Sequence, residues 1–271
     1  MTRSPISHAM SRSWSILSRS PSKFFMVLTP KGWRRFRGLF KEPAASSAKQ
    51  AAYTARLKAQ REDFKSDTWS HDGAVSKRRY ADYDDYIAHQ VDKLDSLGGK
   101  AFANPEKAVQ RFRRRFEIID QLLPHGSVLC LGARRGEEVK AFIELGHFAI
   151  GIDLNPGPTP ELVVVGDFHA LNFANESVDC VYMNCLDHAW DLDKILSEIC
   201  RVLKPGGLFV ADIVHGYEEG FAVGNHDTMH WAKARDFGEH IAELGALRLE
   251  SFRDLAEHGS PQWTQAVMRK I

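Results

Sequence analysis

The residues most able to do chemistry in this chain lie at the ends of three short apolar segments. The apolar run Val128 to Leu131 leads directly into a glycine turn, Gly132 to Gly136. A second apolar run ends in Asp153, and a third, Val163 to Val165, is followed by Asp167. In a parallel α/β sheet such a turn lets the backbone approach a cofactor, and a carboxylate after the next strand binds the ribose hydroxyls. The pattern therefore predicts a nucleotide-cofactor crevice.

Further segments continue the alternation of strand and helix. The sequence predicts a fourth strand over Ser177 to Asn184, then a helix, and then a Leu-Lys-Pro-Gly-Gly turn before a fifth strand, Leu208 to Ile213. A helix over Ala232 to Leu244 precedes two final strands, Leu247 to Phe252 and Trp263 to Arg269. Strands that alternate with helices in this way indicate an α/β domain with a mostly parallel sheet.

In this order, the segments resemble a class I S-adenosylmethionine-dependent methyltransferase with a methyltransferase type 11-like domain. The resemblance covers about residues 105 to 271, and its most specific part is the turn before the fifth strand. It implies a Rossmann-like α/β fold, in which a mostly parallel seven-stranded sheet ends in an antiparallel hairpin. It also implies S-adenosylmethionine as the cofactor. No metal ion is expected, because Cys180 and Cys185 lack the close pairing and the histidine companions of a zinc site.

The resemblance also implies which residues bind the cofactor. Asp153 is expected to hold the ribose hydroxyls and Asp167 to accept from the adenine amino group, with Phe168 or Leu154 beside the ring. The full expected set is Gly132, Ala133, Arg134, Gly136, Asp153, Leu154, Asp167, Phe168 and Asn184.

The first motif departs from the family's pattern at two positions. Cys130 stands where the family usually has an acidic residue, and Arg134 stands where it usually has the middle glycine. Weaker cofactor binding, compensation by another residue, and a catalytically silent domain that serves as a scaffold all remain open. A nicotinamide-dependent reductase is disfavoured, because its Gly-x-Gly-x-x-Gly would also require glycine at Arg134 and Glu137.

Methyl transfer from a sulfonium is an in-line displacement that chiefly requires a close, aligned and shielded nucleophile. A base is needed only for an acceptor that keeps its proton, where it accelerates the step by roughly 100- to 10,000-fold. His188, after the fourth strand, and His169, after Asp167 and Phe168, are the candidate bases. The alternative for each is a histidine that shapes the pocket through hydrogen bonds to the backbone.

The expected methyl acceptor is a small molecule, a sugar or a lipid-linked compound. Three helices are predicted before the first strand of the sheet. They begin at Ala48, near Tyr80 and at Pro105. Family members place such helices over the cofactor edge, which implies substrate contact or simple packing for Tyr83, Tyr86, His89 and Gln90. In the third helix the cluster Arg111, Arg113, Arg114 and Arg115 is expected to form a solvated face. His226 and His230 lie in a predicted loop, where substrate contact or exposure is expected.

The net charge of +1 conceals a basic arm on an acidic body. Residues 1 to 41 hold nine Lys or Arg and no Asp or Glu, among many serines and aromatics. This arm has the composition of an organelle transit peptide, of a membrane-surface segment or of a plain terminal extension. Nucleic-acid binding is not expected, because the body does not repeat the arm's charge. The predicted location is cytoplasmic, with peripheral membrane contact or an organelle as the alternatives.

The predicted organisation has three parts: arm and linker over 1–47, a helical cap over 48–104, and the methyltransferase-like domain over 105–271. Apolar content of 44% supplies a sizeable core, and no segment has the roughly 20 consecutive apolar residues of a membrane helix. The four cysteines are expected to be reduced, because a disulfide framework is unusual in a large, cysteine-poor chain.

Overall fold

The computed structural model describes residues 44–71, 73–97, 104–123, 125–157 and 160–271. The chain divides into two compact units at Arg56 and Leu57, inside helix α2 (Ala44–Asp63). The basic arm predicted for residues 1 to 41 lies outside the described residues. None of the described helices combines the length and the apolar content needed to cross a lipid bilayer.

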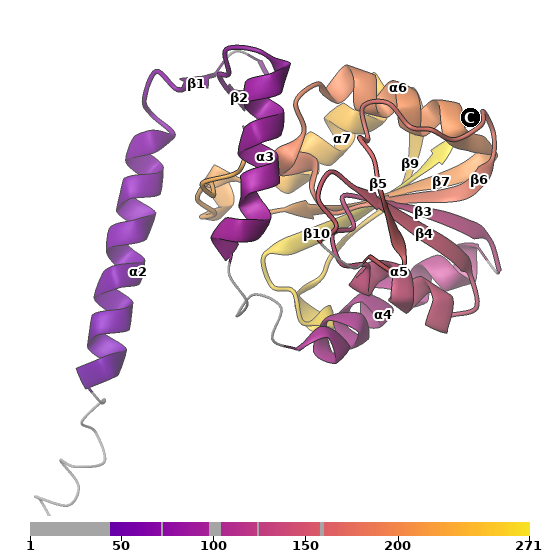
Figure 1. The fold of residues 1–271 in the computed structure, drawn as a ribbon, viewed down its shortest axis with the longest axis horizontal. Helices are drawn as coiled ribbons and strands as arrows, with labels where there is room; N and C mark the ends of the chain where they lie inside the picture. Colours follow the sequence, from indigo (N-terminus) through magenta and orange to yellow (C-terminus); the bar gives the residue numbers. More distant parts are fainter. Residues whose placement is uncertain (1–43, 72, 98–103, 124, 158–159) are drawn as a thin grey trace, which may run out of the picture. The chain divides into compact units, whose positions relative to one another are not determined.

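The second unit is built on a seven-stranded sheet in the order β5-β4-β3-β6-β7-β10-β9 (Figure 1). Within this sheet, the five strands β3 to β7 pair in parallel, and β10 pairs antiparallel with both β7 and β9. The sheet is therefore mostly parallel and ends in an antiparallel hairpin, which confirms the predicted fold class. Its strands are β3 (Ser127–Leu131), β4 (Phe148–Asp153), β5 (Val163–Val165), β6 (Val178–Met183), β7 (Leu203–Val214), β9 (Leu247–Asp254) and β10 (Trp263–Lys270).

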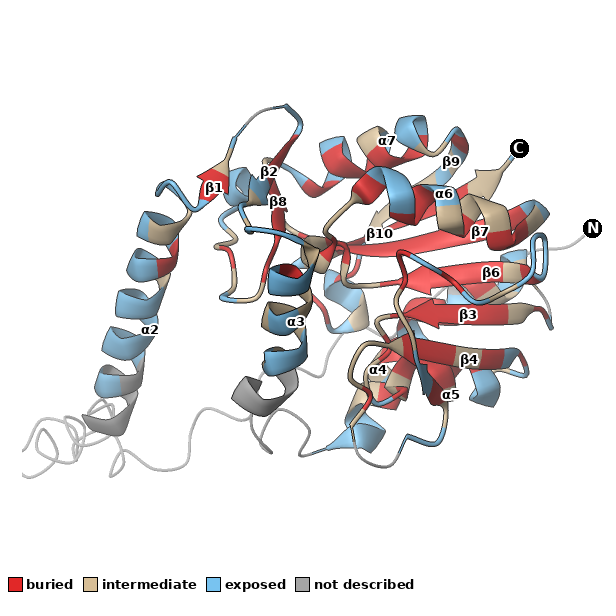
Figure 2. Cartoon of the chain, turned by 45° about the horizontal axis from the view of Figure 1, so that its top comes forward, coloured by how far each residue is buried: buried red, intermediate tan, exposed pale blue. Residues whose placement is uncertain are grey.

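Helices cover both faces of this sheet, because its strands are apolar on both sides. Within β3, Leu129 and Leu131 contribute to one apolar core, while Val128 and Cys130 contribute to the other. This alternation follows from the two-residue repeat of a strand. The first core also receives α6 (Leu192–Val202) and α7 (Ala234–Leu244), and the second receives α4 (Pro105–Leu122) and α5 (Glu137–Glu144) (Figures 1 and 2).

Local signals explain where the covering helices begin. Pro105 occupies the first turn of α4, and the Asn104 side chain accepts a hydrogen bond from the Lys107 backbone at 3.0 Å. Asp191 caps α6 in the same way, accepting from the Lys194 backbone at 3.0 Å. Such caps satisfy N–H groups that have no partner inside the helix.

The arginine cluster of α4 is not a uniformly solvated face. Arg114 is exposed, but Arg115 is buried and forms an ion pair with Asp212 of β7 at 2.8 Å. Asp212 also accepts from the Tyr182 hydroxyl and from the Gln265 amide. The prediction for Arg115 was wrong. Arg115 lies next to the apolar stripe of α4 and therefore faces the buried Asp212 carboxylate, which the sequence pattern alone does not show.

A smaller sheet forms outside the main one, from β1 (Trp69–Ser70), β2 (Val75–Arg78) and β8 (Met229–Trp231). It joins segments about 150 positions apart in the chain, with Ser76 opposite His230 in the β2–β8 register. The predicted loop around His230 therefore contains a strand, and His230 is 1% exposed. The expectation that His230 would be exposed was wrong, because the pairing with β2 covers it.

Candidate functional site

The turn after β3 has the tight geometry expected of a cofactor loop. Gly132 has a φ of 67°, and an added Cβ would stand 2.3 Å from the Cys185 sulfur. Glycine is therefore required there, both for its backbone conformation and for space. Ala133 donates from its backbone to the Ile152 carbonyl at 3.0 Å, which ties the turn to β4. Gly136, with a φ of 80°, leads directly into α5.

Arg134 shows how the turn tolerates the loss of the usual middle glycine. Its φ is 46°, a left-handed conformation that is uncommon for a residue with a side chain. Its backbone N–H donates to the Asp153 carboxylate at 2.9 Å. Asp153 also accepts from the Asn155 backbone at 2.8 Å. The carboxylate after β4 is thus held against the turn after β3, as the sequence predicted for two neighbouring strand ends.

Asp167, the carboxylate expected near the adenine, contacts helix α3 (Tyr83–Leu97). It accepts hydrogen bonds from the Tyr83 hydroxyl and from the His169 backbone and ring, the last two at 2.8 Å. Burial opposes ionisation, but these hydrogen bonds outweigh it and lower the pKa of Asp167 to about 2. Asp167 is therefore a carboxylate at neutral pH, and both of its oxygens already accept hydrogen bonds.

His169 is buried with both ring nitrogens in hydrogen bonds. Its Nε2 faces the backbone N–H groups of Trp190 and Asp191, each at 3.3 Å, so it acts as an acceptor. Its Nδ1 then carries the hydrogen and donates to Asp167. This arrangement connects the segments after β5 and β6, and in it His169 has no free lone pair to take a proton from a substrate.

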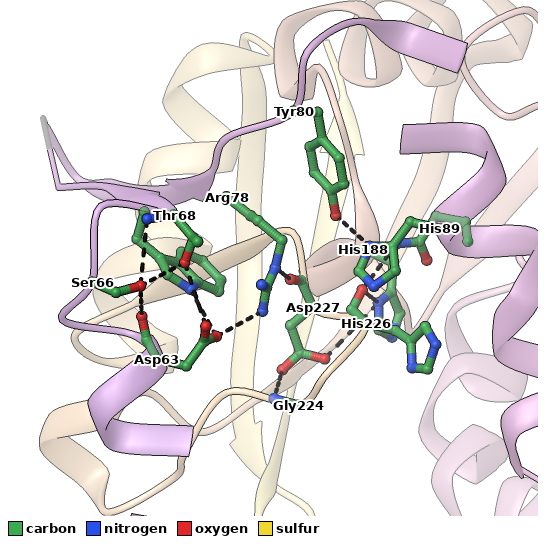
Figure 3. Close-up of polar contacts among 12 residues, drawn as sticks. Asp63, Ser66, Thr68, Arg78, Tyr80, His89, His188, Gly224, His226 and Asp227 are labelled. Carbon is green, nitrogen blue, oxygen red and sulfur yellow. Dashed lines mark hydrogen bonds and ion pairs between the residues drawn. The ribbon is translucent and has the colours of Figure 1, made fainter. Parts of the chain in front are cut away.

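His188 lies in the short helix η4 (Leu186–His188), and α3 reaches over it. Its Nδ1 donates to the His226 carbonyl at 2.8 Å, and the Lys93 ammonium donates to its Nε2. Figure 3 shows His188 between His226 and Asp227. Burial, aided by the positive charge of Lys93, lowers the pKa of His188 to about 3. The Asp227 carboxylate raises this pKa, but its effect is smaller than those of burial and Lys93.

Eight of the residues selected from the sequence meet around one cavity of about 50 Å³. Glycine, carboxylate and aromatic groups from the ends of three strands face residues of α3 there. Its lining consists of Tyr86, Gln90, Lys93, Gly132, Arg134, Asp153, Leu154, Asn155, Phe168, Cys185 and His188. A cavity needs about 10 to 15 Å³ of such space to hold one water molecule, so this cavity holds a few waters and is much smaller than a nucleoside requires.

Several other predicted residues lie beside this cavity but do not line it. Ala133 and Gly136 shape the turn, and Asn184 is half-buried after β6. Tyr83 and His169 line a separate hollow of about 230 Å³ with Trp190, Asp191 and Lys194. His89 stacks on His226, with ring centroids 5.0 Å apart.

Lys93 is a cavity residue that the sequence reasoning missed. It follows Tyr86 and Gln90 at helical spacing, so the three share one face of α3. Tyr86 donates to the His188 carbonyl at 3.1 Å, and Gln90 donates to the His226 carbonyl at 2.9 Å. Extending the face that already contained Tyr86 and Gln90 by one turn would have found Lys93.

Two carboxylates near His188 form, together with its imidazole, a group that could bind a metal ion. One ligand atom from each of Asp187, His188 and Asp227 lies within 4.8 Å of the others. Lys93 contacts the same imidazole, and its positive charge acts to lower the pKa values of both carboxylates. Lys93 therefore lies at the position where a cation would meet these carboxylates, and burial lowers the pKa of Lys93 while it raises those of Asp187 and Asp227.

A comparison with protein families matches residues 129–211 to a methyltransferase domain. Among curated proteins, the chain is 31% identical over 152 residues to malonyl-[acyl-carrier protein] O-methyltransferase 1 of Coxiella burnetii, covering 52% of this chain and 53% of that protein. It is 29% identical over 128 residues to 24-methylenesterol C-methyltransferase 2 of Oryza sativa subsp. japonica, covering 40% and 34%. The chain thus spans about half the length, or less, of these relatives.

Among solved structures, the fold is similar to that of 1,6-didemethyltoxoflavin-N1-methyltransferase of Burkholderia thailandensis, which was solved with S-adenosylhomocysteine bound. The TM-score is 0.58 at 17% identity, and the match covers 74% of this chain and 97% of that one. At this identity the likeness concerns the fold. Together with the family match over β3 to β7, it confirms the resemblance deduced from the glycine turn and the Leu-Lys-Pro-Gly-Gly segment.

Proposed function

We propose that this chain, a class I S-adenosylmethionine-dependent methyltransferase by its domain match and fold, transfers the methyl group of that cofactor to a small-molecule acceptor. The observation that carries the proposal is the pairing of the Gly132 turn with Asp153 across the ends of β3 and β4. A glycine turn and a facing carboxylate are the groups that bind an adenosine ribose in this class of sheet.

The residues present fit the cofactor chemically. Asp153 supplies acceptors for the ribose hydroxyls, and the buried Phe168 and the Leu154 side chain supply apolar surface for the adenine ring. When bound, the cofactor supplies a methyl group activated by a sulfonium charge. The chain's own contribution is to position the acceptor and exclude water, which in an in-line displacement account for most of the acceleration.

The volume of the cavity adds a mechanical requirement. Because about 50 Å³ does not accommodate a nucleoside, Gln90 and Lys93 of α3 have to withdraw before the cofactor enters. Polar and aromatic contacts hold α3 in place. Tyr83 donates to Asp167, Gln90 to the His226 carbonyl and Lys93 to His188. The fully buried Tyr86 packs on Trp190 and His169. We therefore assign α3 the role of a cap that opens for cofactor binding and closes over the reactants.

The acceptor is proposed only as a class. One relative is named for a malonyl group on an acyl-carrier protein and another for a sterol, so the similar proteins differ in acceptor. We propose a small-molecule, sugar or lipid-linked acceptor. A screen of extracted metabolites with methyl-labelled S-adenosylmethionine tests this, with the Asp153→Ala protein as the control for background labelling. Transfer that depends on Asp153 supports the proposal.

The competing function is a catalytically silent scaffold, which the replaced residues Cys130 and Arg134 favour. Calorimetric titration with S-adenosylmethionine, S-adenosylhomocysteine and NADH separates the two. An enzyme of the proposed class binds the first two and not the third. A folded protein that binds none of them would support the scaffold and contradict the proposed function.

We also propose that the basic arm, residues 1 to 41, directs the protein to an anionic membrane surface from the cytoplasm, with an organelle as the alternative destination. Nine positive charges among aromatic residues support this, since each Lys or Arg near such a surface contributes about 1 kcal/mol. Cosedimentation of the full chain with phosphatidylserine vesicles at low and high salt tests it. Binding that is absent at low salt would contradict the proposed membrane contact.

A further inference from the structure

A second cavity, of about 470 Å³, lies against the small sheet and shares no lining residue with the cofactor crevice. Ser76 and His230 face it, whereas their neighbours Val75 and Trp231 point into the main core, as the alternation along β2 and β8 requires. Its lining is Gln60, Arg61, Phe64, Lys65, His71, Gly73, Ala74, Ser76, Tyr217, Phe221, Ala222, Val223 and His230. This volume is in the range of sites that bind small organic molecules.

The polar group that makes this cavity unusual is His230. It is 1% exposed, and within the described part of the chain neither of its ring nitrogens has a partner at hydrogen-bond distance and angle, although the Phe221 backbone lies close enough to affect its pKa. Buried polar groups in folded proteins nearly always have one. Burial lowers the pKa of His230 to about 4, against a weaker opposing effect of the Phe221 backbone, so the imidazole is neutral at physiological pH. A neutral imidazole offers one donor and one acceptor, which matches a hydroxyl group.

The walls around His230 are aromatic. The Phe64 ring lies 4.8 Å from the ring of His71, 5.5 Å from Tyr217 and 5.2 Å from His230, measured between centroids. Aromatic rings pack best against further aromatic rings, either edge to face or offset. The cavity therefore suits a flat ring system better than a flexible chain.

The outer rim of the cavity is cationic. Arg61 and Lys65 line it and are exposed, and neither takes part in an ion pair among the residues that the structure describes. The lining contains no Asp or Glu. The nearby Asp63 is paired with Arg78 at 3.1 Å, and Glu62 lies 3.8 Å from Lys58. Two positive side chains at the entrance and no carboxylate in the lining favour an anionic ligand.

We propose that this cavity is a second binding site, for a hydroxylated aromatic carboxylic acid. Its ring system packs against Phe64 and Tyr217, its hydroxyl exchanges hydrogen bonds with His230 in the interior, and its carboxylate faces Arg61 and Lys65 at the rim. Because the two cavities have no lining residue in common, the site binds its ligand independently of the cofactor crevice.

The probe for this site is a hydroxynaphthoate with its hydroxyl and carboxylate at opposite ends of the ring system. Its fluorescence reports binding to the full chain. Naphthoate, which lacks the hydroxyl, and naphthol, which lacks the carboxylate, should each bind about tenfold more weakly, since each loses one hydrogen-bonded or charged contact. The titration is repeated with saturating S-adenosylhomocysteine. Unchanged affinity is expected, and displacement of the probe would place it in the crevice and overturn the proposal.

Substitutions assign the two ends of the ligand. His230→Leu should weaken hydroxynaphthoate about tenfold and leave naphthoate unchanged, because only the first ligand has the hydroxyl. Arg61→Gln and Lys65→Gln should weaken both carboxylates and leave naphthol unchanged. Lys58→Gln is the matched control, since it removes a positive charge from α2, the helix that also carries Arg61, but does not line the cavity.

His230→Leu removes a buried imidazole without partners, so it should fold with equal or higher melting temperature. Equal affinity of the parent and His230→Leu for hydroxynaphthoate would overturn the proposal. Equal affinity of the parent for all three probes would do the same without any variant. Failure of S-adenosylhomocysteine to bind would leave these results intact, so the proposed methyl transfer and this site can fail separately.

Discussion

The Lys93 ammonium of α3 contacts Nε2 of His188, a residue 95 positions later in the chain. Nδ1 of the same imidazole donates to the His226 carbonyl at 2.8 Å. Both nitrogens of the leading candidate base are therefore occupied while α3 is closed. Catalysis by His188 as a base would require Lys93 to leave and the imidazole pKa to rise from about 3.

Removing the charge of Lys93 should raise the pKa of His188. Burial is the larger cause of its low value and persists in Lys93→Met, so the pKa should rise but stay below the usual 6.5. Titration of the His188 ring signals by NMR measures this directly. Lys107→Met, at an exposed lysine of α4, is the control. An unchanged or lower His188 pKa in Lys93→Met would contradict the charge assignment.

For turnover, the geometry favours a positioning role for His188 over a basic one. His188→Asn should raise the KM for the acceptor and change kcat by less than about tenfold, with no change in the pH profile. Loss of a true base would lower kcat by about 100-fold or more. Steady-state kinetics from pH 5 to pH 9 distinguish the two, and a large kcat loss with an altered acidic limb would restore the base hypothesis.

Asp153 should contribute to cofactor affinity more than to stability. Loss of a charge-assisted hydrogen bond costs about 1.5 to 3 kcal/mol, so Asp153→Ala should weaken S-adenosylhomocysteine binding roughly ten- to 150-fold. Asp254→Ala is the matched control, because Asp254 also accepts from a backbone N–H, of Ala256 at 2.7 Å, but lies away from the crevice. Calorimetry and thermal melts measure both variants. Parent-like affinity of a well-folded Asp153→Ala would remove Asp153 from the site.

If α3 must open, cofactor association should be limited by that opening. The observed binding rate in stopped-flow experiments should level off at high S-adenosylhomocysteine concentration. Gln90→Ala removes the hydrogen bond to the His226 carbonyl and should raise that limiting rate several-fold. Asp92→Ala, at an exposed position of the same helix, should leave it unchanged. A rate that rises linearly with concentration in every variant would show that the crevice is already accessible.

The sequence was sufficient for the sheet and for the glycine turn, because both depend on local patterns. Apolar runs, Gly132 and the Leu-Lys-Pro-Gly-Gly segment each determine structure within a few residues. It was insufficient for features created by distant pairing. The β2–β8 pairing buries His230, and α3 brings Lys93 to His188. In each of these two pairs, the local sequence of one segment does not indicate which distant segment it contacts, so periodicity does not identify these contacts.

Arg115 should be a major contributor to stability although it was expected to be solvated. Removing one partner of a buried ion pair typically costs about 3 to 5 kcal/mol, because the other charge stays buried. Arg115→Met would leave Asp212 with the Tyr182 and Gln265 contacts only. Denaturant unfolding should show a loss in that range, while Arg114→Met should change stability by less than about 0.5 kcal/mol. Similar small losses in both variants would contradict the structural role of the pair.

His230 should also make stability depend on pH in a defined window. Its pKa is about 4 in the folded chain and near 6.5 when unfolded, so between these values the unfolded state binds more protons. Stability from this residue is therefore fully present above about pH 6.5 and is lost as the pH falls toward 4, by up to roughly 3 kcal/mol. Glu138 acts in the opposite direction: burial raises its pKa to about 8, so its contribution to stability is fully present below about pH 4.5 and is lost as the pH rises toward 8.

The contribution of His230 is therefore measured as a difference between two proteins. Unfolding free energies of the parent and of His230→Leu, determined from pH 4 to pH 8, share every other titrating group. Their difference should grow as the pH falls, with the variant the more stable protein under acid, because leucine has no proton to bind. A difference that is constant with pH would mean that the folded protein accommodates a charged imidazole. His230 would then have an unrecognised partner in the second cavity.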